Sequence, residues 1–146
     1  MNENLTYSKN GLHLTEGFEG CRLTAYKDVA GVWTCGYGHT GPDVHMGQTI
    51  TPEQAAAFLM QDIQVAAKAV KRLVTVPVSQ NVFDSLVDFT FNCGQGNMAH
   101  STLLRMVNTG DLKAAANEFE KWDKAGGKVV AGLLRRRQAE EAEFNG

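Results

Sequence analysis

The chain has 146 residues, a length that fits one domain with a sizeable buried core. Hydrophobic residues make up 43% of it and charged residues 21%, which argues against a disordered polypeptide. The net charge of −2 gives no reason to expect nucleic-acid binding, and no stretch is long and apolar enough to insert into a membrane. The polar N-terminus lacks the apolar run of a signal peptide or anchor, so we expect the protein to be made in the cytoplasm and not to export itself. Two basic clusters, Lys68-Lys71-Arg72 and Arg135 to Arg137, are interpreted as solvated helix surface.

The three cysteines, Cys21, Cys35 and Cys93, form an odd set without the C-x-x-C spacing of a zinc site. A disulfide scaffold is therefore not expected, although a single bridge between two of them stays open. We expect reduced thiols with structural roles. Because residues alternate between the two faces of a strand, Cys35 should point away from Thr34 and toward a core.

The first predicted element is a helix with Ser8 as its N-cap, extended by apolar residues at helical spacing as far as Glu19. Gly20 then fits the left-handed position that often ends a helix. Over residues 23–50, glycines separate short β-type segments. The sequence therefore predicts a helix followed by a small antiparallel sheet.

A long helix is predicted next, over about residues 52–72. Thr51 is its N-cap, Pro52 occupies the first helical position, and Gln54 completes a capping box. Apolar residues keep a helical period for about 20 residues. We expect this helix to join the sheet-bearing lobe to the rest of the domain.

The remainder of the chain is predicted to be helical. Suitable N-caps and apolar periodicity mark helices over 79–92, 101–108, 111–122 and 134–144, with a glycine-containing loop over 124–133. The predicted architecture is a single α+β domain. It has a small lobe of helix and sheet over about 8–51 and a larger all-helical lobe over 73–146, with a substrate cleft expected between the two lobes.

Candidate catalytic residues lie where the first helix gives way to the sheet. Glu19 and Asp28 are nine positions apart, and Thr34 follows on a predicted strand. Taken singly, they suit a helix end, a turn and a strand. Together, a glutamic acid facing an aspartate can supply a proton donor and a base that activates water, the minimum equipment for glycosidic bond cleavage. His39 is interpreted as a structural histidine paired with Asp62.

The joint spacing Glu19-x8-Asp28-x5-Thr34-x-Gly-x-Gly-His resembles the signature of the phage-type lysozymes, the endolysins of glycoside hydrolase family 24. That signature reads E-G-x-R-L-x-x-Y-x-D-x-x-G-x-x-T-x-G-x-G-H, and every fixed position is present. The resemblance continues through 50–62, through Asn92-Cys93-Gly94, and through an R-R-R-x-x-E pattern within 134–144. It covers roughly residues 12–144 and implies a lysozyme-like fold.

The resemblance implies hydrolysis of the β-1,4 bond between N-acetylmuramic acid and N-acetylglucosamine in bacterial peptidoglycan. Glu19 would be the general acid. Asp28 would orient and activate water or stabilise the oxocarbenium-like charge, and Thr34 would hold that water. Inversion of the anomeric centre is expected, with no cofactor and no metal.

The resemblance also implies how substrate and partners are engaged. The residues expected at the sugar sites are Tyr26, Gly38, Thr40 and Asn92, together with Arg136 as the arginine reaching toward Glu19. Peptidoglycan glycan strands would be the partner of a monomer that lyses the host cell, and a holin would give access to the cell wall.

Two alternatives stay open. A lytic transglycosylase cleaves the same bond without water and forms a 1,6-anhydro sugar, but it generally uses one acid, so Asp28 and Thr34 disfavour it. A non-catalytic peptidoglycan-binding module could keep the same fold. The presence of Glu19, Asp28 and Thr34 together favours the hydrolase.

Overall fold

The computed structural model describes residues 1–146 and divides into two compact units. Unit 1 comprises Met1–Leu14 and Val65–Gly146, and unit 2 comprises Thr15–Gln64. Helices α1 (Lys9–Glu19) and α2 (Pro52–Leu73) contribute residues to both units. The predicted first helix and the predicted long helix are thus both present, within one residue of their expected ends.

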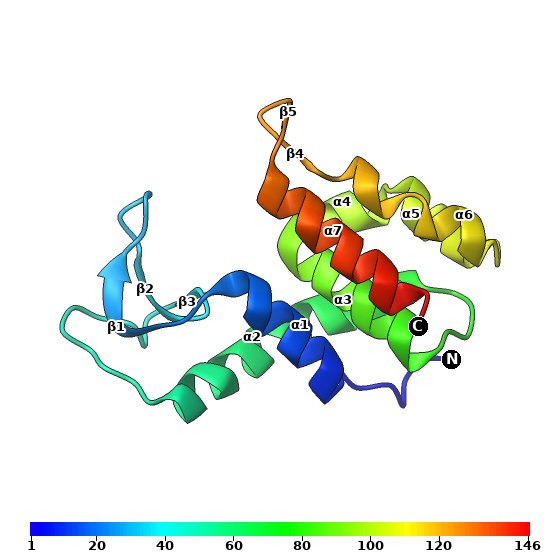
Figure 1. The fold of residues 1–146 in the computed structure, drawn as a ribbon. Coiled ribbons are helices and arrows are strands. Elements are labelled where there is room, and N and C mark those ends of the chain that lie inside the picture. The colour runs from blue at the N-terminus through cyan, green and yellow to red at the C-terminus, as the bar shows by residue number, and fades with distance from the viewer. The chain divides into compact units, whose positions relative to one another are not determined.

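Unit 2 is built on a three-stranded antiparallel sheet of order β1-β2-β3 (Figure 1). The strands are β1 (Arg22–Lys27), β2 (Trp33–Gly36) and β3 (His39–Thr40). Tyr26 lies opposite Thr34 in the first pair, and Thr34 lies opposite Thr40 in the second. Three of the predicted site residues therefore form one row across the sheet.

A small core holds the sheet against α2. Cys35, Val44, Ile50 and Ala55 are buried together, with partly buried hydrophobic side chains packed around them. As predicted, Cys35 points into this core. Gly36 ends β2 with a positive φ of 62°, and a Cβ there would lie 3.4 Å from Ala55. Glycine thus lets the chain turn tightly where the sheet meets the helix.

Unit 1 is helical, and α7 (Ala131–Phe144) lies along α3 (Gln80–Cys93) (Figure 1). Shorter helices complete the unit: α4 (Gln95–Ala99), α5 (Thr102–Asn108), α6 (Leu112–Ala116) and the 3₁₀ turn η1 (Phe119–Lys121). An aromatic cluster forms its core. The Phe119 ring meets Phe89 and Phe144 edge-on, with centroids 5.9 and 5.4 Å away, an arrangement that adds to their burial energy.

Three predictions for unit 1 differ from the structure. The helix predicted over 111–122 is broken, because α6 ends at Ala116 and Phe119 turns into the aromatic core from a 3₁₀ turn. The predicted loop over 124–133 contains a hairpin of β4 (Lys124–Ala125) and β5 (Lys128–Val129). These strands are too short to give a periodic pattern. Helix α4 was not predicted, and α7 begins at Ala131, inside the predicted loop.

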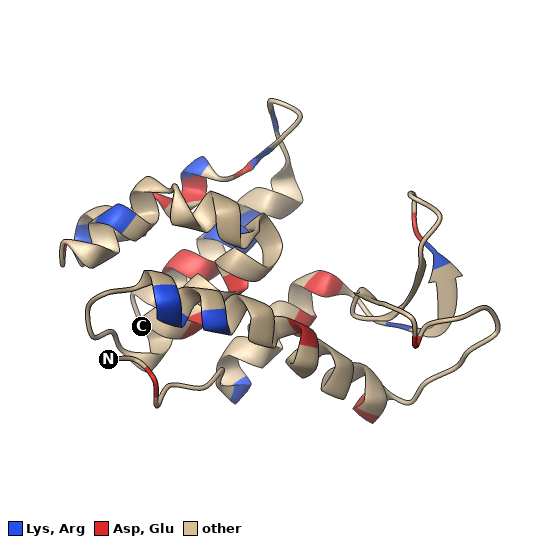
Figure 2. Ribbon diagram, turned by 180° about the vertical axis from the view of Figure 1, so that it is seen from behind, with Lys and Arg blue, Asp and Glu red and all other residues tan.

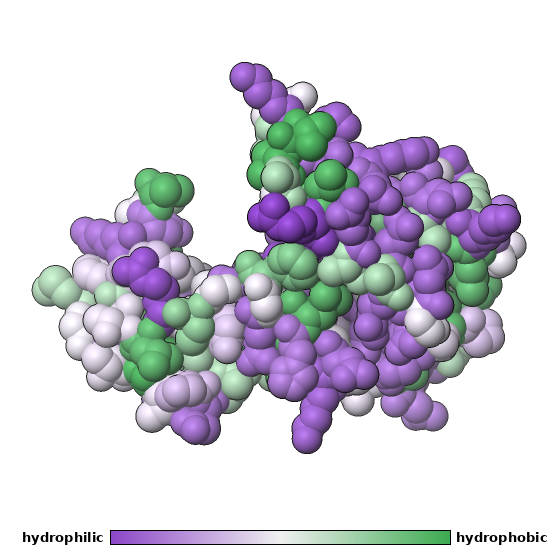
Figure 3. Space-filling view, viewed as in Figure 1, coloured by the Kyte–Doolittle hydropathy of each residue, from purple (hydrophilic) through white to green (hydrophobic).

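Acidic and basic residues are interspersed along both units (Figure 2). Most of the face seen in Figure 3 is hydrophilic, with a hydrophobic patch beside the β4–β5 hairpin, where Val129 and Val130 are exposed. None of the helices combines the length and hydropathy needed to cross a membrane.

The capping box of α2 gives a test of the fold. Gln54 N donates to Thr51 Oγ1 at 3.1 Å, and Thr51 N donates to Gln54 Oε1 at 2.9 Å. Thr51→Ala removes the hydroxyl and leaves a first-turn N–H without its partner. We expect the free energy of unfolding, measured by urea denaturation, to fall by about 1 kcal/mol. Thr6→Ala is the control, since the Thr6 side chain is exposed and forms no hydrogen bond; equal losses in both variants contradict the prediction.

Candidate active site

Glu19 is the last residue of α1, as predicted. The following Gly20 has a φ of 60°, the left-handed conformation that ends helices. The Glu19 side chain is half-buried. Backbone geometry therefore places this carboxyl at the point where the chain leaves the helix for strand β1.

Asp28 is held by the turn that it begins. Its Oδ1 accepts hydrogen bonds from Ala30 N at 2.8 Å and from Val32 N at 2.9 Å. Gly31 N closes the turn on the Asp28 carbonyl at 2.9 Å. The second oxygen, Oδ2, forms no hydrogen bond within the protein. The turn thus fixes the carboxylate through one oxygen and leaves the other available to a ligand or water.

Thr34 meets Asp28 at a shared acceptor. The carbonyl of Val32 accepts the Thr34 hydroxyl at 2.9 Å and also the Asp28 N–H at 2.9 Å. Thr34 is buried, with 4% of its surface exposed. Because its proton is committed to Val32, the Thr34 oxygen presents lone pairs rather than a donor to any neighbouring water.

His39 lies between two carboxylates. Its Nδ1 is 2.8 Å from Asp62 Oδ2, and its Nε2 is 3.0 Å from Asp43 Oδ2. Its ring stacks on Phe58, with centroids 4.1 Å apart. Burial alone lowers the pKa of His39, but the hydrogen bonds to Asp43 and Asp62 outweigh it and raise the pKa above its ordinary value. The structure brings His39 and Asp62 together.

Asp43 is the residue that sequence reasoning missed. It follows His39 by four positions in a loop, so no helical spacing linked the two. Its hydrogen bond with His39 lowers the pKa of its carboxyl. The available signal was the short stretch His39-Thr40-Gly41-Pro42-Asp43, in which a glycine and a proline can turn the chain back upon the histidine.

The other candidate residues of unit 2 line the sheet. Tyr26 is half-buried, and the guanidinium of Arg22 lies 4.2 Å from its ring centroid. Gly38 and Thr40 are exposed on either side of the buried His39. A nearby tyrosine, Tyr37, has its pKa raised by burial and by a hydrogen bond with Glu16.

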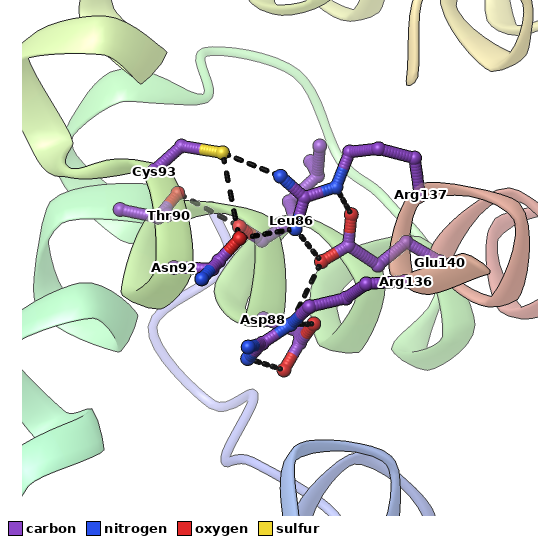
Figure 4. Close-up of polar contacts among 8 residues, drawn as sticks. All are labelled: Leu86, Asp88, Thr90, Asn92, Cys93, Arg136, Arg137 and Glu140. Atoms are coloured by element: carbon purple, nitrogen blue, oxygen red, sulfur yellow. Dashed lines mark hydrogen bonds and ion pairs between the residues drawn. The ribbon is translucent and has the colours of Figure 1, made fainter. Parts of the chain in front are cut away.

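Asn92 and Arg136 belong to unit 1, where they join one polar network that is buried around Arg136 and reaches the surface at the exposed Asn92 (Figure 4). Arg136 donates from Nε and Nη2 to the two oxygens of Asp88, at 3.0 and 2.9 Å. Arg137 donates to Asn92 at 2.8 Å and to the Cys93 sulfur at 2.6 Å. The expectation of a solvated arginine cluster is thus wrong for two of its members. Arg136 and Arg137 are 4% and 0% exposed, because carboxylates on α3 and α7 compensate their charges.

Glu140 completes the network. Its carboxylate lies 2.7 Å from Arg137 Nε and 3.9 Å from Arg136 Nε. Burial raises the pKa of Glu140 well above its ordinary value, and the neighbouring Asp88 carboxylate raises it further, while the two arginines act in the opposite direction. Burial and the neighbouring Asp88 thus favour the protonated form of Glu140, and the two arginines favour its carboxylate.

A hollow of about 240 Å³ borders this network. Its lining combines an aromatic ring, two amides and two cationic side chains with smaller residues, and consists of Asn92, Cys93, Asn97, Trp122, Lys124, Leu133 and Arg137. All three cysteines are free, and no group of three His, Cys, Asp or Glu side chains is placed to hold a metal ion.

A small antiparallel sheet in one unit and a helical bundle in the other define a lysozyme-like α+β fold. Residues 16–140 match the family model described as phage lysozyme, and the chain belongs to this family.

Individual relatives agree with this assignment. A crystal structure of a P22 lysozyme variant superposes with a TM-score of 0.92 at 40% identity, covering 97% of this chain and 99% of that one. The muramidase domain of SpmX from Asticaccaulis excentricus gives 0.89 at 38% identity, covering 97% and 98%. The endolysin of Bacillus phage B103 is 45% identical over 142 residues, which are 96% of this chain and 54% of that protein. The chain thus spans about half the length of the Bacillus phage endolysins it matches.

The buried network of unit 1 has a testable pH dependence. Below the pKa of Glu140 in the unfolded chain, both states hold the proton and folding carries no cost. As the pH rises from there toward the higher pKa of the folded state, the free energy of unfolding decreases. Glu140→Gln removes this ionisation, so its free energy of unfolding relative to that of the wild type should rise with pH, by an amount of the order of 1 kcal/mol.

Urea denaturation of both proteins between about pH 4 and about pH 9 measures this difference in the free energy of unfolding. Glu53→Gln is the matched control, because Glu53 is exposed in the first turn of α2. It should leave the pH dependence of the wild type unchanged. A difference in the free energy of unfolding between Glu140→Gln and the wild type that stays constant across this range contradicts the raised pKa of Glu140.

Proposed function

We propose that this chain is an endolysin that hydrolyses the β-1,4 bond between N-acetylmuramic acid and N-acetylglucosamine in peptidoglycan. The observation that carries the proposal is the shared hydrogen bonding of Asp28 and Thr34 at the Val32 carbonyl. It ties Asp28, whose Oδ2 forms no hydrogen bond within the protein, and Thr34, whose oxygen keeps its lone pairs, to one residue, Val32, on the unit in which Glu19 ends α1. Family membership and the names of the relatives support the same activity.

In the proposed reaction Glu19 is the general acid. It transfers its proton to the glycosidic oxygen as the bond to the anomeric carbon breaks, so the leaving sugar departs with a neutral hydroxyl. Positive charge develops on the ring carbon and ring oxygen of the other sugar. The Asp28 carboxylate stabilises this charge across a short distance.

Water is the proposed nucleophile. The water donates one hydrogen to Asp28 Oδ2 and the other to the Thr34 oxygen. These two hydrogen bonds direct a lone pair of the water at the anomeric carbon. Asp28 takes the first proton as the new carbon–oxygen bond forms. Attack by water from the face opposite the leaving group inverts the anomeric centre, which is the outcome we expect.

Five residues are proposed to bind the sugar chain: Tyr26, Gly38, Thr40, Asn92 and Arg136. Tyr26, Gly38 and Thr40 flank the row of sheet residues that contains Thr34. Asn92 offers its amide NH₂, because its Oδ1 is occupied by Arg137. Arg136 is proposed to take part in substrate binding as a positive charge that Asp88 holds in place.

Access to the cell wall belongs to the proposal as well. The enzyme is proposed to work as a monomer that accumulates in the host cytoplasm and reaches peptidoglycan through a holin-type lesion. Hydrolysis of the glycan strands then lyses the cell.

Replacement of the acid tests the proposal directly. Glu19→Gln keeps the size and polarity of the side chain but removes the transferable proton. We expect release of reducing ends from purified peptidoglycan to fall by about 10²–10⁴-fold, with the free energy of unfolding changed little. Glu53→Gln, the exposed control on α2, should keep full activity. Normal activity of Glu19→Gln excludes this residue as the acid, and 1,6-anhydro products from the wild type identify a transglycosylase instead.

Asp28→Asn tests the role of Asp28 as a base separately from its role in the turn. An asparagine Oδ1 can still accept the hydrogen bonds from Ala30 and Val32, so the turn should persist. The remaining amide cannot take a proton from water. We expect kcat to fall by about 10²-fold or more while binding of glycan fragments is retained. A rate near that of the wild type rules out the role of Asp28 in directing water.

A further inference from the structure

The second carboxylate on His39 has no assigned role in the reaction. Asp43 is half exposed, at 51% of its side chain, yet both of its oxygens lie 3.0–3.1 Å from His39 Nε2. On the opposite side of the ring, Asp62 lies 2.8–3.1 Å from Nδ1. The buried imidazole is thus held at both nitrogens by acceptors from two different elements, α2 and the loop after β3.

Only one protonation state satisfies this arrangement. An ionised carboxylate accepts hydrogen bonds and cannot donate them, so each ring nitrogen must carry a proton. The imidazolium meets that need, and its positive charge lies between two negative ones. A neutral ring has a single N–H, so one carboxylate would then face a nitrogen lone pair at hydrogen-bonding distance. Asp43 can therefore hold its loop in place through His39 only while the imidazole is charged.

The loop that carries Asp43 is part of the sheet's support. Val44, the next residue, is buried in the core of unit 2. Farther along, Gln48 O accepts from Ala25 N at 2.9 Å, and Ile50 N donates to Leu23 O at 2.9 Å. The loop thus leaves β3 and returns along the free edge of β1, the strand that leads directly into Asp28. Asp43 and His39 fasten the start of this path.

His39 is also tied to the strand of the proposed water-holding residue. In the β2–β3 pair, His39 lies opposite Cys35, and Thr40 lies opposite Thr34. A shift of β3 would therefore move the strand partner of Thr34 by the same amount. Misplacement of a reacting group by about 1 Å can cost about 10²-fold in rate.

We propose that Asp43 is a positioning residue for glycoside hydrolysis. Together with Asp62 it keeps His39 as an imidazolium, which fixes β3 against β2 and thereby the location of Thr34. This inference rests on the proposed function of Glu19, Asp28 and Thr34. Asp43 itself touches neither substrate nor water in the reaction.

The other groups around His39 do not compete for its proton. Phe58 on α2 contacts the ring face and has no charge. Cys35 on β2 is fully buried, and burial, with Asp43 and Asp62 adding to it, raises the pKa of its thiol. The thiol therefore stays neutral where His39 titrates. The two carboxylates are the charged groups that face the ring.

The test follows His39 and the reaction in the same samples. The ring of His39 is titrated by NMR from about pH 5 to about pH 10, and kcat and KM are measured over that range with a soluble glycan-strand fragment. The chain has four histidines, so the His39 signal is assigned by its loss in His39→Gln. The proteins compared are the wild type, Asp43→Asn, Asp43→Glu and the exposed-acid control Glu53→Gln.

In the wild type, the alkaline fall of kcat reflects ionisation of the Glu19 acid as well as loss of the His39 charge, so the test compares the alkaline fall of kcat and the His39 titration midpoint of each variant with those of the wild type. Asp43→Asn should move both to lower pH together, because the ring loses one of the acceptors that stabilise its charge. At a pH between the two midpoints its kcat should be about 10-fold lower than that of the wild type, with KM changed less than about 2-fold. Asp43→Glu should restore both midpoints toward those of the wild type, and Glu53→Gln should leave them unchanged.

Two results overturn the proposal. One is a His39 midpoint that moves in Asp43→Asn while the kcat profile stays in place, which reduces Asp43 to a contributor to stability. The other is a His39 midpoint unaffected by Asp43→Asn. If Asp43→Asn folds poorly, Asp43→Glu keeps the proposal testable: a displacement of the His39 midpoint in that variant without an equal displacement of the kcat profile also overturns it. A wild type without hydrolytic activity, or activity that survives Glu19→Gln, instead refutes the proposed function, and the NMR titration stays interpretable.

Discussion

The candidate active site depends on one backbone group, the carbonyl of Val32. It accepts a hydrogen bond from the backbone of Asp28 and another from the hydroxyl of Thr34. The Val32 N–H in turn binds the Asp28 carboxylate. The backbone N–H and carbonyl of Val32 thus orient the Asp28 carboxylate and the Thr34 hydroxyl relative to each other. No long-range packing is needed for that relation, because it is built into one tight turn and its strand.

The rest of unit 2 keeps this turn in place. The strand pairing extends the row from Tyr26 through Thr34 to Thr40, and the ion pairs of His39 anchor the last strand to α2. Each unit contains one polar cluster in which the pKa of a buried group is raised, by different causes. In unit 2 two carboxylates raise the pKa of His39, and in unit 1 burial and Asp88 raise the pKa of Glu140 against the effect of two arginines. Each cluster places charge inside the fold only where an opposite charge or a shared proton compensates it.

The sequence predicted what local chemistry determines. The capping box at Thr51, the glycine after Glu19 and the alternation that buries Cys35 each follow from the nearest few residues. The family signature pointed to Glu19, Asp28 and Thr34. Sequence reasoning failed where tertiary contacts decide. Phe119 leaves the predicted helix to reach the aromatic core, and Arg136 and Arg137 are buried by acids 48 and 3 positions away, on α3 and on their own helix. Asp43 was missed because a turn, and not a periodic element, returns it to His39.

The β4–β5 hairpin differs from the rest of unit 1 in its exposure. Every residue from Lys124 to Ala131 is exposed, and its tip consists of Gly126 and Gly127 with φ of 58° and 81°. No buried side chain in this segment anchors it to the helical core. It is therefore the position where an inserted peptide or a fused domain would disturb the fold least, and where a protease would cut a folded chain first.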